Sequence, residues 1–449
     1  MIMSTSEIIY LLLLAPGVAV RAVLRRTSPS RHPGQGSGKF KRVIRYVATS
    51  LPPVAGLILS MTPAAAGRDE RRPLEVIVKS VAEDSLRGDL LSFSTGAGLL
   101  LRGDDGHERR ISTEDLVRLT TSTSISEPSS TEWEVRLTNG DVLFGRWGES
   151  EGDAVTLETV DLGRLTIPLE SITACSSPQA RSAAQREAFE WFHRGGMVRE
   201  DMLLLGNGDT ARGFVVSVNA EGITLDATHG QVRVPLRLLV AIRFATGVAP
   251  PAGKAELRAG VTFKNTGQVT VTDLQWSGRN GSLRMGERDP IRFEAECVVR
   301  VDVFGGRWEW LSAHQPISEE HTPMLSLPWG RMVDRNVLGG AIAVAGETYD
   351  RGVGVHSRSR LTYDLQGQYG EFVTHFGLDD DSGPHADVTV LIRVDGKPRF
   401  EQTGVTRGQL LGPVRLDVAQ ANRIELVVDF GENGDIQDRF NWVEPALVK

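Results

Sequence analysis

Two groups of oxygen-bearing side chains near the C-terminus have the residue types that bind calcium. Three consecutive carboxylates follow an apolar segment, and an acid and an amide stand further along: Asp379, Asp380 and Asp381, then Asp438 and Asn441. Calcium prefers several carboxylate and carbonyl oxygens, which acidic turns supply. The sequence therefore predicts a structural Ca²⁺ site, against the alternative of acidic turns that hydrogen-bond their own backbone.

A second set of side chains has the chemistry that binds sugars. An aromatic ring packs against the C–H face of a sugar, and arginine, histidine and carboxylate groups hydrogen-bond hydroxyls. The candidates are His356, Arg351, Asp379, Arg439 and Trp442. Two alternatives stay open: His356 as a buried histidine satisfied by backbone, and Trp442 as a core residue. Trp329 has the same ambiguity between platform and core.

No catalytic residue is predicted. A glycosidase needs two carboxylates at a set separation in a cleft, and nothing in the sequence marks such a pair. The chain has no Gly-x-Ser-x-Gly, His-Glu-x-x-His or P-loop motif. We therefore expect a non-enzyme, with a hydrolase of unrecognised site as the weakest alternative.

The elements that position these residues are predicted to be β-strands. From about residue 325, apolar and polar residues alternate in short segments, including 361–365 (LTYDL) and 388–394 (VTVLIRV). Regular short strands of this kind are typical of a β-sandwich. The high glycine content, 48 residues, fits a fold with many turns.

The middle of the chain repeats itself. Residues 135–141 (VRLTNGD) and 203–209 (LLLGNGD) each end an apolar strand in Asn-Gly, which is a strong hairpin signal because both turn positions need positive φ. Weaker copies lie before and after these two segments. We predict four small β-sheet or barrel-like repeat modules at residues 74–120, 133–176, 202–244 and 261–311, and a final sandwich at 325–449. A helical linker is predicted at 177–200, and a polar linker with two prolines at 312–324.

The N-terminal 66 residues are predicted to form a signal peptide or N-terminal anchor region. A basic stretch at 39–45 precedes an apolar stretch at 46–61 and the small residues Ala64, Ala65 and Ala66. We place cleavage after Ala66, which makes the protein exported: periplasmic, cell-surface or secreted. An uncleaved membrane anchor is the alternative.

The charge balance excludes one class of partner. Eight of the 50 basic residues and one of the 57 acidic residues lie in the first 66, so the remainder has a formal net charge of −14. An acidic body argues against nucleic acid and is compatible with neutral glycans and cations. The cysteines, Cys175 and Cys297, permit one disulfide or two buried free thiols.

Five ordered motifs in the last domain carry a family resemblance: 351–357 (RGVGVHS), 361–365 (LTYDL), 376–380 (FGLDD), 394–397 (VDGK) and 438–442 (DRFNW). In order and spacing they resemble the NPCBM family of carbohydrate-binding modules over residues 325–449. The resemblance implies a jelly-roll β-sandwich, often attached to exported glycosidases, with galactose-type sugars among its ligands. Arg439 departs from the family pattern, in which a histidine is common at that position.

Together these features predict a mainly β, exported, non-catalytic protein whose C-terminal domain binds a glycan. The repeats would act as a spacer or would bind a protein partner. The alternative is a cell-envelope scaffold or protein-interaction protein with a degenerate sugar site.

Overall fold

The computed structural model describes residues 74–83, 85–151, 153–181, 192, 198–245, 256–286, 288–324 and 328–449, together with 12–15 and 18–21. The chain divides into two units, Met1–Asp69 and Glu70–Lys449. In the first unit, β1 (Leu12–Ala15) pairs antiparallel with β2 (Val18–Arg21). Most of the predicted signal or anchor region lies outside the described residues. Within the described part, no helix is both long and apolar enough to cross a membrane.

Four successive groups of strands in the second unit share one pairing pattern: hairpin-connected strands pair antiparallel, and the first strand also pairs with the last. Module 1 contains β3 (Leu74–Ser80), β4 (Leu86–Ser94), β5 (Gly98–Gly103), β6 (Glu108–Ile111) and β7 (Leu116–Thr121). Module 2 contains β8 (Trp133–Leu137), β9 (Val142–Glu151), β10 (Ala154–Thr159), β11 (Gly163–Pro168) and β12 (Ile172–Ser176).

Module 3 has five strands like modules 1 and 2, and module 4 has six. Module 3 contains β13 (Asp201–Leu205), β14 (Thr210–Val218), β15 (Gly222–Ala227), β16 (Gly230–Pro235) and β17 (Leu239–Arg243). Module 4 contains β18 (Arg258–Phe263), β19 (Gly267–Val271), β20 (Asp273–Ser277), β21 (Asn280–Arg284), β22 (Ile291–Glu294) and β23 (Val298–Phe304). In modules 2, 3 and 4, a 3₁₀ turn precedes the last strand: η1 (Leu169–Ser171), η3 (Leu236–Leu238) and η4 (Ala295–Cys297).

The Asn-Gly turns of modules 2 and 3 have the same geometry. Gly140 and Gly208 both have φ of 89°, which a residue with a Cβ rarely adopts. Asn139 and Asn207 do not have positive φ, which corrects the expectation that both turn positions need it. In each turn the asparagine Nδ2 donates to the aspartate two residues later, at 2.8 Å to Asp141 and 2.6 Å to Asp209. The sequence signal for these two hairpins therefore reflects backbone conformation.

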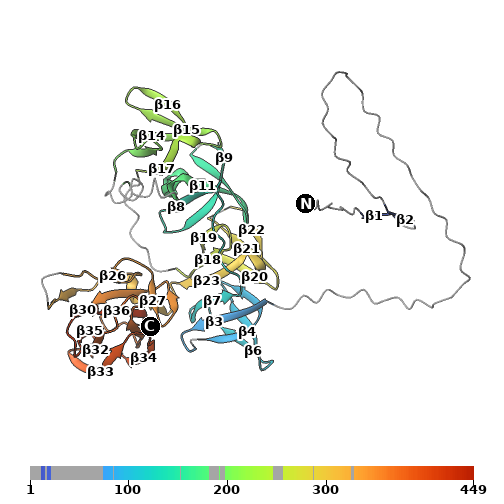
Figure 1. Cartoon of the computed structure of the whole chain (residues 1–449). Helices are drawn as coiled ribbons and strands as arrows, with labels where there is room; N and C mark the ends of the chain where they lie inside the picture. Colours follow the sequence, from blue (N-terminus) through green and yellow to red (C-terminus); the bar gives the residue numbers. More distant parts are fainter. Residues whose placement is uncertain are drawn as a thin grey trace, which may run out of the picture. The chain divides into compact units, whose positions relative to one another are not determined.

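Modules distant in sequence join through their edge strands. Strand β7 pairs with β23, and β4 pairs with β20, so that modules 1 and 4 share sheets; Figure 1 shows their blue and yellow strands together. Strand β12 pairs with β17, which joins modules 2 and 3. Each module is too small to bury a large core by itself, and this pairing gives it neighbours.

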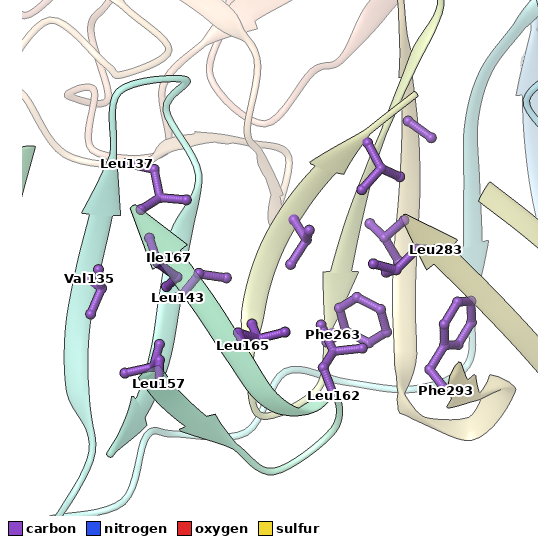
Figure 2. Packing of buried hydrophobic residues seen from close by; sticks show 14 of the residues in the cluster. Val135, Leu137, Leu143, Leu157, Leu162, Leu165, Ile167, Phe263, Leu283 and Phe293 are labelled. Carbon is purple, nitrogen blue, oxygen red and sulfur yellow. The ribbon is translucent and has the colours of Figure 1, made fainter. Parts of the chain in front are cut away.

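One buried cluster runs through all four modules. Figure 2 shows how the leucines of module 2 approach module 4. Leu162 of module 2 and Phe263 of module 4 are both buried, at 5% and 0% exposure. Polar contacts hold the same junction: the Asp161 carboxylate accepts hydrogen bonds from the backbone of Asn265 at 2.7 Å and Thr266 at 2.9 Å. Modules 2 and 4 are therefore packed against each other.

The segment predicted as a helical linker is mostly outside the described residues. It begins with the 3₁₀ turn η2 (Pro178–Arg181). Phe192, which lies in the same segment, is buried at 2% exposure against Ala180, Leu204 and Val240.

The C-terminal domain is a sandwich of two sheets around its own buried cluster. The first has the order β26 (Met332–Val333), β29 (Gly352–His356), β36 (Arg439–Val448), β31 (Glu371–Leu378) and β34 (Leu411–Asp417), with β24 (Trp308–Trp310) also on β36. The second has the order β25 (Ser318–His321), β30 (Ser359–Asp364), β35 (Arg423–Phe430), β32 (Asp387–Val394) and β33 (Lys397–Thr406). A hairpin of β27 (Ile342–Val344) and β28 (Glu347–Tyr349) completes it.

The alternation seen in the sequence matches the burial. In β32 the buried residues are Val388, Val390, Ile392 and Val394, and the residues between them are half-buried. The mainly β class with a final sandwich is confirmed. The sandwich begins earlier than predicted, because β24 and β25 lie in segments that we assigned to module 4 and to a linker, yet they pair with β36 and β30.

Candidate functional site

The pairing of β29 with β36 decides which predicted ligand residues lie together. His356 pairs with Arg439 at one end, and Gly352 pairs with Val443 at the other. A strand rises about 3.3 Å per residue, so Arg351 lies roughly 16 Å along the strand from His356. Arg351 is held there by Asp334, which accepts a hydrogen bond from Nη1 at 2.8 Å. The structure therefore separates Arg351 from His356 and Arg439.

Trp442 is a core residue, which corrects the prediction that it contacts a sugar. Its exposure is 0%, and it belongs to the buried cluster of the sandwich. Its ring lies 5.2 Å from that of Phe440 and 6.0 Å from that of Phe376. A ring without accessible surface cannot stack on a sugar.

Trp329, unlike Trp442, is partly accessible to a ligand. It is half-buried and stacks on His356, with ring centroids 5.1 Å apart and an interplanar angle of 9°. His356 is buried, and its Nδ1 contacts the backbone oxygen of Ser357 at 3.1 Å, as the buried-histidine alternative expects. Burial lowers the pKa of His356, with a smaller lowering by His321 and Arg439. A neutral imidazole thus backs a partly accessible indole.

His321 completes this aromatic group and was missed by sequence reasoning. Its ring lies 6.4 Å from that of His356, and its Nδ1 accepts a hydrogen bond of 3.4 Å from the backbone of Trp329. Its Nε2 is buried and has no hydrogen-bond partner among the described residues. His321 ends a strand that we had taken for a linker, so no local signal marked it. We call His321, Trp329, His356 and Arg439 the Trp329 site.

Charged groups border the Trp329 site. Arg439 is half-buried, and its Nη1 donates to the backbone oxygen of Asp381 at 2.5 Å. The charge of Asp435 acts on His356 and raises its pKa against the effect of burial. The Asp435 carboxylate also accepts a hydrogen bond from the backbone of Met324 at 2.9 Å. The arrangement offers an aromatic face with nearby donors and an acceptor.

The acidic triplet organises a turn. Asp379 is buried at 1% exposure and accepts from Asn441 Nδ2 at 2.8 Å and from the backbone of Asp381 at 3.1 Å. The Asp380 carboxylate accepts from the backbone of Ala345 and Gly346 at 3.0 and 2.9 Å. The prediction that Asp379 contacts a ligand is therefore corrected, because its oxygens are covered and already paired.

Asp438 lies in a separate buried pair. Ser357 Oγ donates to its carboxylate at 2.6 Å, and the backbone of Asp387 donates to the other oxygen at 3.2 Å. Burial raises the pKa of Asp438 to about 7, opposed by these two hydrogen bonds and assisted by the charges of Asp387 and Asp435.

Of the predicted calcium ligands, Asn441 contacts Asp379, whereas Asp380 and Asp438 have other partners. Among the described residues, no three His, Cys, Asp or Glu side chains are placed to hold a metal ion. Asp379 and Asp380 face different backbone donors, and Asp438 faces Ser357. This arrangement does not fit a calcium cage, and Ca²⁺ binding stays a prediction.

Both cysteines are free thiols. Cys175 is buried in β12, and burial raises its pKa well above the usual value. Burial together with Asp161 raises the pKa of Cys297 to about 11. Neither thiol has the depressed pKa of a reactive cysteine.

Comparison with protein families places the Trp329 site in a known type of domain. Residues 307–448 match the NPCBM/NEW2 domain. The C-terminal third is similar to the NPCBM family. This confirms the resemblance read from the five motifs and extends it to β24. The comparison with curated proteins found no match.

Solved structures similar to the chain include several carbohydrate-binding modules. A CBM51 from a Clostridium perfringens GH95, in complex with methyl-galactose, is 24% identical, with 31% of this chain and 99% of that chain covered and a TM-score of 0.29. CBM51-2 with INT domains of Clostridium perfringens ZmpB, in complex with GlcNAc, is 18% identical, with 51% and 43% covered and a TM-score of 0.29. Tandem CBM51 modules of a Streptococcus pneumoniae family 98 glycoside hydrolase are 11% identical, with 78% and 87% covered and a TM-score of 0.28.

Proposed function

We propose that this chain is an exported, non-catalytic carbohydrate-binding protein whose NPCBM domain binds a galactose-type glycan at the Trp329 site. The observation that carries the proposal is the half-buried Trp329 ring, stacked on a neutral His356 beside the unpaired Nε2 of His321. The family match supports a carbohydrate-binding role, and the loop position supports access.

The proposed mode of binding follows from the chemistry of these side chains. The indole of Trp329 would pack against the apolar C–H face of the sugar, because aromatic rings and such faces exclude water together. His356 is a positioning residue that fixes the plane of the indole. His321 Nε2, which has no hydrogen-bond partner among the described residues, would bond to a sugar hydroxyl. This bond removes the cost of a buried unsatisfied group.

Arg439 and Asp435 would add the directional contacts. A guanidinium donates to hydroxyl oxygens, and a carboxylate accepts from hydroxyl hydrogens. The bond of Arg439 to Asp381 uses only Nη1, which leaves the other N–H groups of the guanidinium for the sugar. Donors and an acceptor near an aromatic ring can distinguish sugars by the orientation of their hydroxyls.

A scaffold with a degenerate sugar site is the second candidate, and an observation on module 3 favours it. Module 3 exposes large apolar residues: Phe214 at 55%, Val216 at 46%, Val232 at 50% and Leu238 at 48%. Val232 opposes Leu225 in the same register in which Leu165 opposes Leu157 in module 2, where Leu165 is only 1% exposed. A protein partner would cover this surface under the scaffold function.

The test is a glycan array probed with the full chain, with calcium and with chelator. We expect binding to galactose-type sugars and a loss of about tenfold or more in Arg439→Gln and His321→Ala, since charged or unsatisfied hydrogen-bonding groups contribute about 1.5–3 kcal/mol.

Arg351→Gln is the matched control, because Arg351 is a half-buried arginine that precedes β29, at the opposite end of the β29–β36 pairing from Arg439. It should leave affinity unchanged. Loss of binding in chelator would support the calcium prediction. No binding to any glycan by the folded chain would favour the scaffold function.

A further inference from the structure

Modules 1 and 4 form one continuous sheet with a polar outer face. Ser94, Phe93 and Ser92 of β4 pair with Gln275, Trp276 and Ser277 of β20. The order of strands across this sheet is β6-β5-β4-β20-β21-β22. Phe93 and Trp276 point into the core at 1% and 2% exposure, so the residues next to them point outward. We call this outer face the shared sheet.

The shared sheet has an approximate two-fold axis through the Phe93–Trp276 pair. On one side Arg110 pairs with Leu100 of β5, and on the other Arg292 pairs with Ser282 of β21. Each arginine lies on the outermost of three strands and one residue before an apolar residue, the half-buried Ile111 or the buried Phe293. The two modules therefore place one arginine each at equivalent positions.

A cavity of about 810 Å³ lies over this face, and both arginines line it. The polar residues that line it between them are Ser92, Ser94, Gln275, Ser277, Asn280 and Ser282. Its volume is in the range that holds a sugar-sized or larger ligand. These side chains provide hydroxyl and amide groups along the floor and a cation at each end.

The two arginines, on β6 and β22, differ from arginines on the neighbouring strands β5 and β21. Arg102 binds Glu108 at 3.1 Å, and Arg284 binds Asp273 at 3.3 Å. Among the described residues, Arg110 and Arg292 have no hydrogen-bond or ion-pair partner. In an acidic protein, two symmetric arginines without carboxylate partners that face one cavity indicate an anionic ligand.

We propose that the shared sheet is a second binding site, for an acidic oligosaccharide that carries carboxylate or sulfate groups. Each arginine binds one anionic group through its guanidinium fork, and the serine, asparagine and glutamine side chains bind the sugar hydroxyls between them. The aromatic residues at this site, Phe93, Trp276 and Phe293, are buried in the core. They offer no stacking surface for bases, and two cations neutralise few phosphates, so the face fits a glycan better than a nucleic acid.

The experiment is calorimetric titration of the full chain with three probes: oligogalacturonate, a sulfated galactan oligosaccharide and an oligothymidylate. We expect one of the two acidic glycans to bind. Arg110→Gln and Arg292→Gln should each weaken it about tenfold and together about a hundredfold, as expected for hydrogen bonds to charged groups. Binding should also weaken as salt rises.

Matched controls separate this site from surface charge and from the NPCBM domain. Arg102→Gln and Arg284→Gln remove paired arginines from the neighbouring strands β5 and β21 and should leave the affinity unchanged. Trp329→Ala should also leave it unchanged, so failure of one site is distinguishable from failure of the other. Unchanged affinity in the double arginine variant, no binding of either acidic glycan, equal or tighter binding of oligothymidylate, or loss of binding in Trp329→Ala would overturn the proposal.

Discussion

The Trp329 site and the shared sheet present their polar groups in different ways. At the Trp329 site, a loop tryptophan and groups at strand ends surround one aromatic ring, and the supporting core belongs to a single domain. On the shared sheet, the groups stand on strands of two modules that lie far apart in sequence. The first arrangement needs only its own sandwich, whereas the second needs two modules to pair correctly.

The independence of the two regions is tested most strongly by a substitution in the core of the sandwich that carries the Trp329 site. Trp442→Ala should destabilise the sandwich by about 3–5 kcal/mol, because it leaves a large cavity in a fully buried cluster. Hydrogen exchange of β36 amides measures this change locally. Trp442→Phe should cost less. Acidic-glycan binding by the shared sheet should survive both; its loss would show that the two regions are not independent.

Asp438 should make the stability of the sandwich depend on pH. Its folded pKa of about 7 exceeds the ordinary value of 3.8, so the folded state holds this proton more tightly than the unfolded state. Stability is therefore fully present below about pH 4 and falls as pH rises to about 7, by at most about 1.4 kcal/mol per pH unit.

Hydrogen exchange of β36 between pH 4.5 and 7.5, corrected for the intrinsic exchange rate, measures this slope. Asp438→Asn should flatten it, because the amide does not ionise. An equal slope in wild type and variant would contradict the assignment. Amides of module 3, far from Asp438 in sequence and core, serve as the internal reference.

Two equivalent aspartates test how the modules depend on one another. Asp141 is 1% exposed and accepts from Thr270 of module 4, at 2.7 Å from the backbone and 2.6 Å from the hydroxyl. Asp209 is exposed and bonds within its own turn. Asp141→Ala should cost about 1–3 kcal/mol, and Asp209→Ala no more than about 0.5 kcal/mol. Similar changes in β19 hydrogen exchange for both variants would contradict the claim that Asp141, unlike Asp209, joins its module to module 4.

Features set by local sequence were predictable. The Asn-Gly turns require positive φ at Gly140 and Gly208, and the alternation in β32 follows from one buried face. The five motifs identified the C-terminal domain because their order reflects one sandwich. Two predicted site residues from these motifs, His356 and Arg439, are paired neighbours in the structure, and their role in sugar binding stays a prediction.

Features set by pairing between distant segments were not predictable. Arg110 and Arg292 line one cavity only when β4 pairs with β20, where the paired residues Phe93 and Trp276 are 183 positions apart in the sequence. Trp442 and Trp329 both look like platforms in sequence, and only the packing of β36 against β29 and β31 shows which one is buried. His321 lacked any signal because its strand pairs with β30, which follows much later.

The most direct test of the proposed function is a titration of the full chain with methyl-galactose, comparing wild type with Trp329→Ala. We predict that the variant loses about tenfold or more in affinity, while hydrogen exchange in β36 stays as in wild type, because a half-buried ring supports the ligand and little of the core. Binding of equal strength in the two proteins would contradict the central claim that Trp329 is the sugar platform.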